Sequence, residues 1–315
     1  MAVKRIQNKI AESRLTLPVT ACFGLGIWLL CGLIRQQWWI QVVCYAISTG
    51  IMAELNRGNA LIRVYSRSVS ALFIILSCVA CFLFPSMEAA ITMLCLTASI
   101  MTLFKTYQDP EAVGWTFYTF LLIGLISLMK VQALWLVPLF WLVMAISTNS
   151  FSFRTCLASL LGLALPYFYL LAFVIFRFKS DLSPFTAHFL PLGDFIFPYD
   201  YAQVPLTHSL TYGFLVMLTV TGVVHFLRTS YNDKLRTRQL YYGFMLFNLF
   251  VFILIGLQPQ HFELLMPLAI ISTSPLIAHF ITLTRTRITN IAFFVILIAA
   301  FALIGFNLWT SSFIF

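Results

Sequence analysis

Long apolar segments follow one another along almost the whole chain, with short polar stretches between them. A transmembrane helix needs about 20 mostly apolar residues, and the segments that come close to this requirement span residues 17–34, 37–53, 69–86, 88–104, 113–129, 132–148, 156–177, 208–227, 240–257, 264–282 and 290–310. The pattern predicts an all-α fold, a polytopic transmembrane helix bundle of about eleven spans. We expect residues 1–315 to form a single integral membrane domain.

The basic residues fall unevenly on the two sides that these spans define. Fifteen of the nineteen Lys and Arg residues lie in loops on the side of the N-terminus. The other four are Arg35, Lys130, Arg177 and Lys179. Because cytoplasmic loops of membrane proteins carry an excess of Lys and Arg, we expect the N-terminus inside the cell and the C-terminus outside.

Composition supports a membrane protein and excludes an ordinary soluble domain. The chain is 61% hydrophobic and only 9% charged, whereas about a quarter of the residues in soluble domains are charged. The formal net charge of +9 does not indicate nucleic-acid binding, because the basic residues are scattered between apolar segments and form no continuous basic face.

The sequence contains no known metal or cofactor motif. All seven cysteines lie inside or at the ends of apolar segments, which favours a packing role. Cys78 and Cys81 have the spacing of a redox or metal pair, but no second pair and no histidine lies nearby. Zinc spacing, a nucleophile elbow and a phosphate-binding glycine loop are also absent from the sequence. We therefore expect no cofactor and no metal.

The longest interruption of the apolar pattern runs from Phe178 to Thr207. This stretch is aromatic and rich in proline, and it holds Asp181, Asp194 and Asp200. Flexible linkers are usually polar and poor in aromatic residues. We expect residues 178–207 to form an interfacial segment on the extracytoplasmic side, with a candidate site beneath it.

Polar and charged residues gather on the predicted extracytoplasmic side, where a site could form. Asp194, His261 and Glu263 are the candidate catalytic residues, because a carboxylate or a histidine can act as a general base. Lys130 and Arg177 are the candidate phosphate-binding residues, because cations at headgroup depth can hold a lipid phosphate. The alternative interpretation is that all five are ordinary loop residues at a wet interface.

Other polar positions favour structural roles. No Asp or Glu lies at the centre of a predicted span, which argues against an ion-coupled transporter. Asn248 and Asn307 lie within spans and are expected to make interhelical hydrogen bonds. Arg63 and Arg67 could share a helix face and bind a phosphate, but anchoring of a cytoplasmic loop is the favoured interpretation. The basic loop at residues 228–238 has the same interpretation.

Three passages resemble known membrane proteins. YTFLLIGLISLMKVQALWLVPLFWLVMAI resembles a helical hairpin of polyprenyl-dependent membrane glycosyltransferases of the GT-C fold. FSFRTCLASLLGLALPYFYL resembles the span that follows in those enzymes, and also a stretch of an uncharacterised family of multi-pass bacterial envelope proteins. LQPQHFELLMPLAIISTSPLIAHF is similar to their late helix, with His261 and Phe262 in place of an arginine and a tyrosine.

The resemblance implies only one site residue. It places Lys130 as a lipid-phosphate contact, whereas the family's catalytic carboxylate lies in a long first extracytoplasmic loop. In this chain that loop is residues 35–38, which contain no acid. No catalytic residue is therefore carried over from the family.

These observations lead to one main functional expectation and two alternatives. We expect a protein of the bacterial cytoplasmic (inner) membrane that handles a lipid-linked envelope glycan intermediate, on a polyprenyl phosphate, at the outer leaflet. Its partners would be membrane lipid and a membrane protein, with no nucleic acid. The alternatives are a non-enzymatic subunit or scaffold of an envelope assembly complex and a transporter of small molecules or lipids. The sequence leaves open whether the protein is an enzyme.

Overall fold

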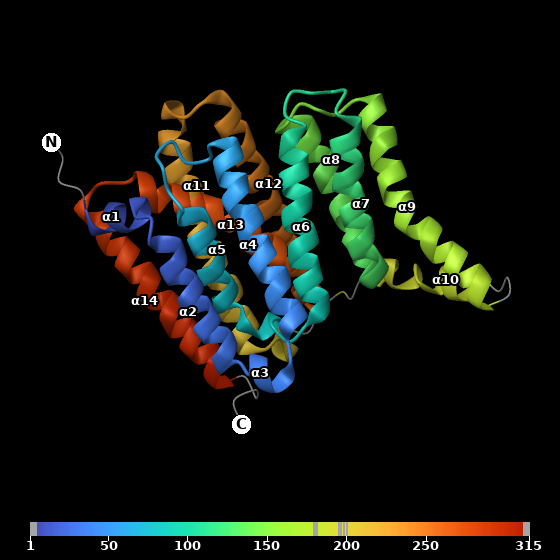
Figure 1. Ribbon diagram of the computed structural model, residues 1–315, viewed down its shortest axis with the longest axis horizontal. Helices are drawn as coiled ribbons and strands as arrows, with labels where there is room; N and C mark the ends of the chain where they lie inside the picture. Colours follow the sequence, from blue (N-terminus) through green and yellow to red (C-terminus); the bar gives the residue numbers. More distant parts are fainter. Residues whose placement is uncertain (1–4, 179–181, 195–196, 198, 200, 311–315) are drawn as a thin grey trace.

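The computed structural model describes residues 5–178, 182–194, 197, 199 and 201–310, and in these ranges the chain is helical with no β-strand (Figure 1). The first half forms α1 (Ile6–Glu12), α2 (Thr16–Leu30), α3 (Leu33–Gln36), α4 (Trp39–Asn59), α5 (Ser68–Val79), α6 (Met87–Lys105) and α7 (Val113–Met129). The second half forms α8 (Leu136–Ile146), α9 (Phe153–Phe178), α10 (Ser183–Ala187), α11 (Leu206–Thr229), α12 (Leu235–Leu257), α13 (Phe262–Leu283) and α14 (Arg287–Thr310). Short 3-10 helices join them: η1 (Cys81–Leu83), η2 (Val131–Trp135), η3 (Leu190–Gly193), η4 (Tyr201–Gln203), η5 (Ser230–Asn232) and η6 (Pro259–His261).

Local sequence signals explain several helix boundaries. Ser86 caps the N-terminus of α6, where its side chain accepts a hydrogen bond from the Ala89 backbone N–H at 3.2 Å. Gly32 separates α2 from α3 with a φ of 95°, a left-handed conformation that glycine adopts without steric cost. Proline at the start of α10 occupies a position where its missing N–H is not needed.

The prediction of an all-helical bundle is confirmed, but the count of eleven spans is not supported. Within the described residues, six helices are long and apolar enough to cross a membrane, namely α6, α9, α11, α12, α13 and α14. A seventh arises if α1 and α2, which meet at 89°, count as one span. The predicted spans at α5 and α8 contain helices of 12 and 11 residues. An α-helix of that length reaches about 18 Å, well short of a hydrocarbon core of about 30 Å.

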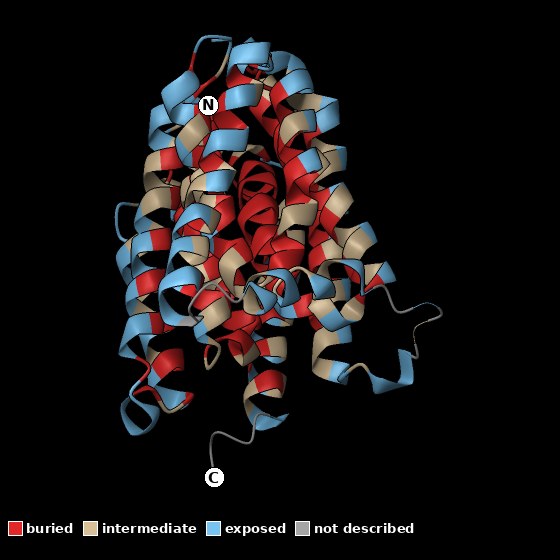
Figure 2. Ribbon diagram, turned by 90° about the vertical axis from the view of Figure 1, so that its right-hand side faces the viewer, coloured by how far each residue is buried: buried red, intermediate tan, exposed pale blue. Residues whose placement is uncertain are grey.

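The central element of the bundle is α13, which is buried along its whole length (Figure 2). It packs against α11 and α12 on one side and against α5 and α6 on the other. Close packing to α11 depends on Gly222, because a Cβ there would lie 2.9 Å from the backbone carbonyl carbon of Leu276. Most residues of α13 are apolar on every side of the helix, which favours burial, and the buried Ser272 and Ser274 hydroxyls donate hydrogen bonds to carbonyl oxygens of the same helix.

Helices α7 and α9 form a close pair at one edge of the bundle, on the right of Figure 1. Gly162 of α9 lies directly on the backbone of α7 at Phe117, and Gly124 of α7 lies on α9 at Pro166. Small residues of this kind let helix backbones approach each other closely in membrane proteins. Near the end of α7, the Tyr167 hydroxyl donates a hydrogen bond to Ser127 Oγ at 2.8 Å.

Polar contacts gather the loops at two opposite ends of the bundle. At one end, which we call the basic end, α1 contacts the loop after α4 and the end of α13, and the loops that follow α6 and α8 are bonded to each other. There Gln7 and Asn8 are buried and donate hydrogen bonds to the Thr284 and Thr282 carbonyl oxygens. At the other end, which we call the rim end, the loops that follow α7 and α12 contact the connection that contains α10, and the loop after α5 contacts the start of α13. Which end faces the cytoplasm stays a prediction.

Candidate functional site

Lys130, a predicted phosphate ligand, forms an ion pair at the rim end. It follows the last residue of α7, and its ammonium nitrogen lies 2.9 Å from Oε2 of Glu88 in the first turn of α6. Both side chains are a little under half exposed, at 44% and 45%. Sequence reasoning missed Glu88, because a lone carboxylate at a span boundary gives no pairing signal. The ion pair means that an incoming phosphate would compete with Glu88 for Lys130.

His261 lies beside this ion pair. Its ring meets the Trp135 ring edge-on at a centroid distance of 5.0 Å. The Lys130 ammonium and the Asp194 carboxylate both lie close enough to interact electrostatically with the imidazole. Three segments that are distant in the sequence therefore place a cation, a histidine and a carboxylate side by side.

Asp194 is held at this position by its backbone. Gln260 donates a hydrogen bond from Nε2 to the Asp194 carbonyl oxygen at 3.1 Å. The same Nε2 lies 3.1 Å from Nε2 of His261 and 3.0 Å from Oε1 of Gln258. This hydrogen bond joins the Asp194 backbone to the loop that carries His261.

Glu263 lies in the first turn of α13, where the helix dipole favours a carboxylate. Ser86 Oγ lies 3.4 Å from Glu263 Oε2, at donor distance. Since Ser86 caps the helix that carries Glu88, Glu263 lies in the same region as the Glu88–Lys130 ion pair. We call Glu88, Lys130, Asp194, His261 and Glu263 the rim cluster.

Arg177, the second predicted phosphate ligand, does not join the rim cluster. It is exposed in the last turn of α9, ten residues beyond Tyr167, which contacts the end of α7. Ten helical residues extend about 15 Å, and Figure 1 shows α9 leaning away from α7, so that its end lies to the right of the end of α7. The prediction that Arg177 and Lys130 share one phosphate is therefore not supported by their placement. Lys179, Asp181 and Asp200 lie outside the described residues.

The connection between α9 and α11 is tied down over the rim end by hydrogen bonds. Gln132 donates from Nε2 to the Pro191 carbonyl oxygen at 3.1 Å, and the Tyr201 hydroxyl donates to the Gly256 carbonyl oxygen at 2.7 Å. His188 Nε2 lies 3.1 Å from the Ser127 carbonyl oxygen. The connection therefore covers the ends of α7 and α12.

Aromatic rings lie next to the rim cluster. His208 in α11 stacks face to face on Phe262, with centroids 4.4 Å apart and parallel planes. Phe82 packs against both rings. Together with Trp135, these rings border the charged groups with flat apolar surface.

At the basic end the structure contains a second titratable group, which the sequence analysis did not single out. His279, in the fully buried α13, lies with Nε2 3.0 Å from Oδ2 of Asp233, and both side chains are at most 1% exposed. Arg63 Nε lies 3.8 Å from the other Asp233 oxygen. The ring of His279 is surrounded by His225, Phe226 and Tyr241 at centroid distances of 5.2–5.4 Å. The one feature of the sequence that could have indicated this buried pair is the presence of His279 within the apolar segment 264–282.

The position of the Asp233–His279 pair favours a structural role. His279 lies four residues before the end of α13, about 6 Å from the helix terminus, so the pair is not at the centre of a span. It links α13 to the connection between α11 and α12 and to Arg63. This placement is compatible with the expectation that no carboxylate lies at mid-span. The basic loop at residues 228–238 also contributes a buried contact, that of Asp233 with His279, as well as surface charge.

The asparagines predicted to join helices do so. Asn248 accepts a hydrogen bond from the Thr273 hydroxyl of α13 at 3.0 Å. Asn307 of α14 donates to the Val79 carbonyl oxygen at 2.6 Å and to Thr211 Oγ1 at 3.2 Å. Among the described residues, no group of three or more His, Cys, Asp or Glu side chains is placed to hold a metal ion.

Comparison with known proteins identifies no relative: no family model, no curated protein and no solved structure matches this chain.

Proposed function

We propose that the protein binds the polar headgroup of a lipid-linked glycan, carried on a polyprenyl phosphate, at the rim end of its helix bundle. The observation that supports this proposal is the rim cluster, in which five charged or titratable side chains from four segments of the chain gather at one end of a bundle of apolar helices. A lipid-anchored headgroup lies at this depth while its chain remains in the hydrocarbon region.

The composition of the rim cluster fits a glycan joined to a phosphate better than a phosphate alone. The cluster has three carboxylates and one lysine, and its lysine is already paired with Glu88. Sugar hydroxyls can donate hydrogen bonds to Asp194 and Glu263, while the phosphate competes with Glu88 for Lys130. The flat rings of Trp135 and of the His208–Phe262 stack offer apolar surface for the faces of a sugar ring.

The chemical step that suits this arrangement is glycosyl transfer. The acceptor hydroxyl oxygen would form a bond to the anomeric carbon, and the bond from that carbon to the phosphate oxygen would break. Asp194 or Glu263 would take the proton of the acceptor hydroxyl as general base. Lys130 would stabilise the charge on the departing phosphate.

The first test of this proposal compares the two partners of the ion pair. Lys130→Ala removes the cation and should weaken binding of a polyprenyl phosphate about tenfold or more, because hydrogen bonds to charged groups contribute about 1.5–3 kcal/mol. Glu88→Gln removes the competing carboxylate and should preserve or strengthen binding. The bound fraction is measured by native mass spectrometry of the purified full chain in mild detergent.

Glu111→Gln is the matched control for this experiment. It breaks the exposed Arg154–Glu111 ion pair, with atoms 2.6 Å apart, at the basic end, and should leave binding unchanged. Equal binding by the wild-type protein and Lys130→Ala would contradict the proposal. Equal weakening by all three variants would show that the effect is general loss of structure.

A second test separates glycan recognition from phosphate binding. Asp194→Asn and Glu263→Gln should weaken binding of a polyprenyl diphosphate sugar by about three- to tenfold, since each removes a charged acceptor. Both variants should bind the sugar-free polyprenyl phosphate as the wild type does. If the two ligands respond equally, the carboxylates do not contact the glycan and this part of the proposal fails.

A further inference from the structure

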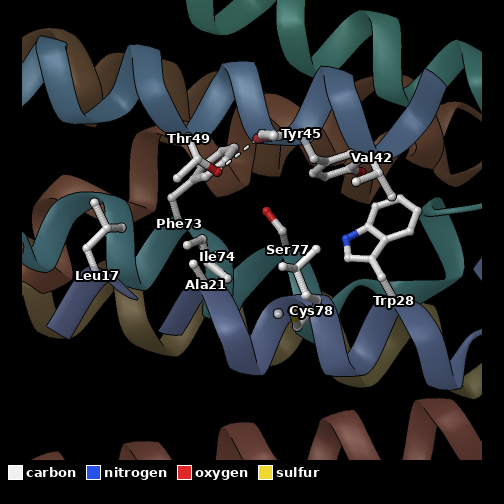
Figure 3. A pocket seen from close by; sticks show the side chains of 13 residues that line it. Leu17, Ala21, Trp28, Val42, Tyr45, Thr49, Phe73, Ile74, Ser77 and Cys78 are labelled. Atoms are coloured by element: carbon white, nitrogen blue, oxygen red, sulfur yellow. Dashed lines mark hydrogen bonds between the residues drawn. The ribbon is translucent and has the colours of Figure 1, made fainter. Parts of the chain in front are cut away.

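Helices α2, α4 and α5 line a cavity of about 290 Å³ (Figure 3). This is close to the lower limit of small-molecule pockets, about 300 Å³. Its walls are mainly apolar, with Leu17, Trp28, Phe73 and Ile74 among the lining side chains. The cavity is separate from the rim cluster, because none of the five rim residues lines it.

The cavity opens on the outer surface of the bundle. Both α2 and α4 pack against α5, and the cavity lies between them with α5 as its floor. Leu25 of α2 and Ala46 of α4 line it and are exposed. Neighbouring exposed residues of these helices, such as Leu29 and Val43, are apolar. If α2 and α4 lie in a membrane, this surface faces lipid chains, and a molecule can enter sideways from the bilayer.

Two hydroxyl groups in the cavity lack hydrogen-bond partners. Tyr45 Oη and Ser77 Oγ belong to residues that are only 5% exposed, and neither is bonded to a described residue. Thr49 lines the same cavity but donates its hydroxyl to the Tyr45 carbonyl oxygen at 2.8 Å. A buried hydroxyl left unbonded costs about 1–3 kcal/mol, and water cannot repay this cost from the hydrocarbon side. The two hydroxyls are therefore unbonded donors in the wall of the cavity, and because each oxygen atom is itself buried, a ligand reaches it by displacing a neighbouring side chain.

The surroundings of Tyr45 fix where the polar part of such a ligand would lie. Trp28 stacks on Phe84 at a centroid distance of 3.7 Å, and Tyr45 meets both rings edge-on at 5.4 and 5.5 Å. These contacts immobilise the phenol ring near the rim end of the cavity. Figure 3 shows the Ser77 hydroxyl pointing into the cavity from α5. From Trp28 the apolar wall continues along α2 to Leu17, eleven residues or about 16 Å away.

We propose that this cavity binds a long-chain lipid through a carbonyl oxygen that accepts hydrogen bonds from Tyr45 and Ser77. A carbonyl oxygen has two lone pairs and can accept from both hydroxyls at once, and the chain lies against the wall that leads to Leu17. The ester carbonyl of a membrane lipid and the ring carbonyl of a lipophilic quinone share this chemistry. The proposal does not depend on the rim cluster or on the function proposed for it.

The experiment measures binding of a fluorescent polyene fatty-acid methyl ester to the purified full chain in detergent. Tyr45→Phe and Ser77→Ala should each weaken binding about two- to tenfold, because a neutral hydrogen bond contributes about 0.5–1.5 kcal/mol. Thr49→Val, which removes a hydroxyl that is already bonded within α4, is the matched control and should change binding less than twofold. Ala21→Phe fills the cavity and should abolish binding.

Competition identifies the source of the carbonyl. A phosphatidylcholine that displaces the probe would indicate a membrane-lipid ester, and a decyl-substituted benzoquinone that displaces it at lower concentration would indicate a quinone. Hexadecane, which has no acceptor oxygen, should compete with the probe for the cavity, and its affinity should be the same for the wild type and for Tyr45→Phe. Equal affinity of the probe for the wild type, Tyr45→Phe and Ser77→Ala would overturn the proposal.

Two further measurements distinguish loss of probe binding at the cavity from failure of the rim site and from loss of stability. Lys130→Ala should bind the probe as the wild type does, so a failure at the rim end cannot be mistaken for a failure here. Without ligand, Tyr45→Phe should unfold at the same temperature as the wild type or a higher one, because it removes an unbonded buried hydroxyl. A variant that lost both affinity and stability would indicate a packing role for Tyr45 and contradict the proposal.

Discussion

Replacing Asp233 with alanine is expected to lower the free energy of unfolding by about 3–5 kcal/mol, because it removes one partner of a buried pair. His279 would then lose its hydrogen bond inside the fully buried α13, where no water replaces it. Arg63 would also lose its carboxylate neighbour, although it is 38% exposed and can be hydrated. The measurement is unfolding of the purified protein in detergent, followed by circular dichroism.

Two variants test whether burial of the Asp233–His279 pair is the cause. Glu111→Ala breaks an ion pair of similar geometry whose side chains are 73% and 69% exposed, and it should cost at most about 1 kcal/mol. The double variant Asp233→Leu with His279→Phe should recover part of the loss, since replacing both partners of a buried pair with apolar groups is often neutral. Equal losses for Asp233→Ala and Glu111→Ala would refute the expectation.

Gly162→Ala should destabilise the protein by about 1–3 kcal/mol, the usual cost of overpacking a close contact. The added Cβ would meet the Phe117 carbonyl oxygen and lie 3.0 Å from the Leu121 backbone nitrogen. Both atoms belong to the backbone of α7, so no side-chain rotation can relieve the overlap. The two helices would have to move apart, and thermal unfolding in detergent would show the loss.

Gly26→Ala is the opposite control for this prediction. Gly26 also lies within a helix, α2, but a Cβ there meets no atom within 4 Å. Alanine is favoured over glycine in a helix by about 1 kcal/mol, so this variant should be as stable as the wild type or more stable. If Gly162→Ala were also neutral, the contact between α7 and α9 would be looser than the structure indicates.

The sequence predicted which residues gather at the rim end, but it did not predict their pairing. The alternation of spans and loops places Lys130, Asp194, His261 and Glu263 on one side, because chain direction reverses at each turn. Glu88 was missed because its pairing with Lys130 depends on how α6 and α7 pack. Arg177 was grouped with Lys130 only because both lie on the same predicted side of the membrane, and the divergence of α9 from α7 separates them.

What the sequence by itself determined is the class of structure, a bundle of apolar helices with polar residues at two ends. Apolar segments of about 20 residues specify this, because a helix satisfies its backbone hydrogen bonds internally wherever it lies. What only the tertiary structure decided is how many helices are long enough to cross a membrane and which groups become neighbours. Asp233 and His279, 46 residues apart, and Tyr45 and Ser77 across the α4–α5 cavity meet through packing. Packing depends on helix length, angle and close contacts such as that of Gly162, and hydropathy along the chain does not specify these.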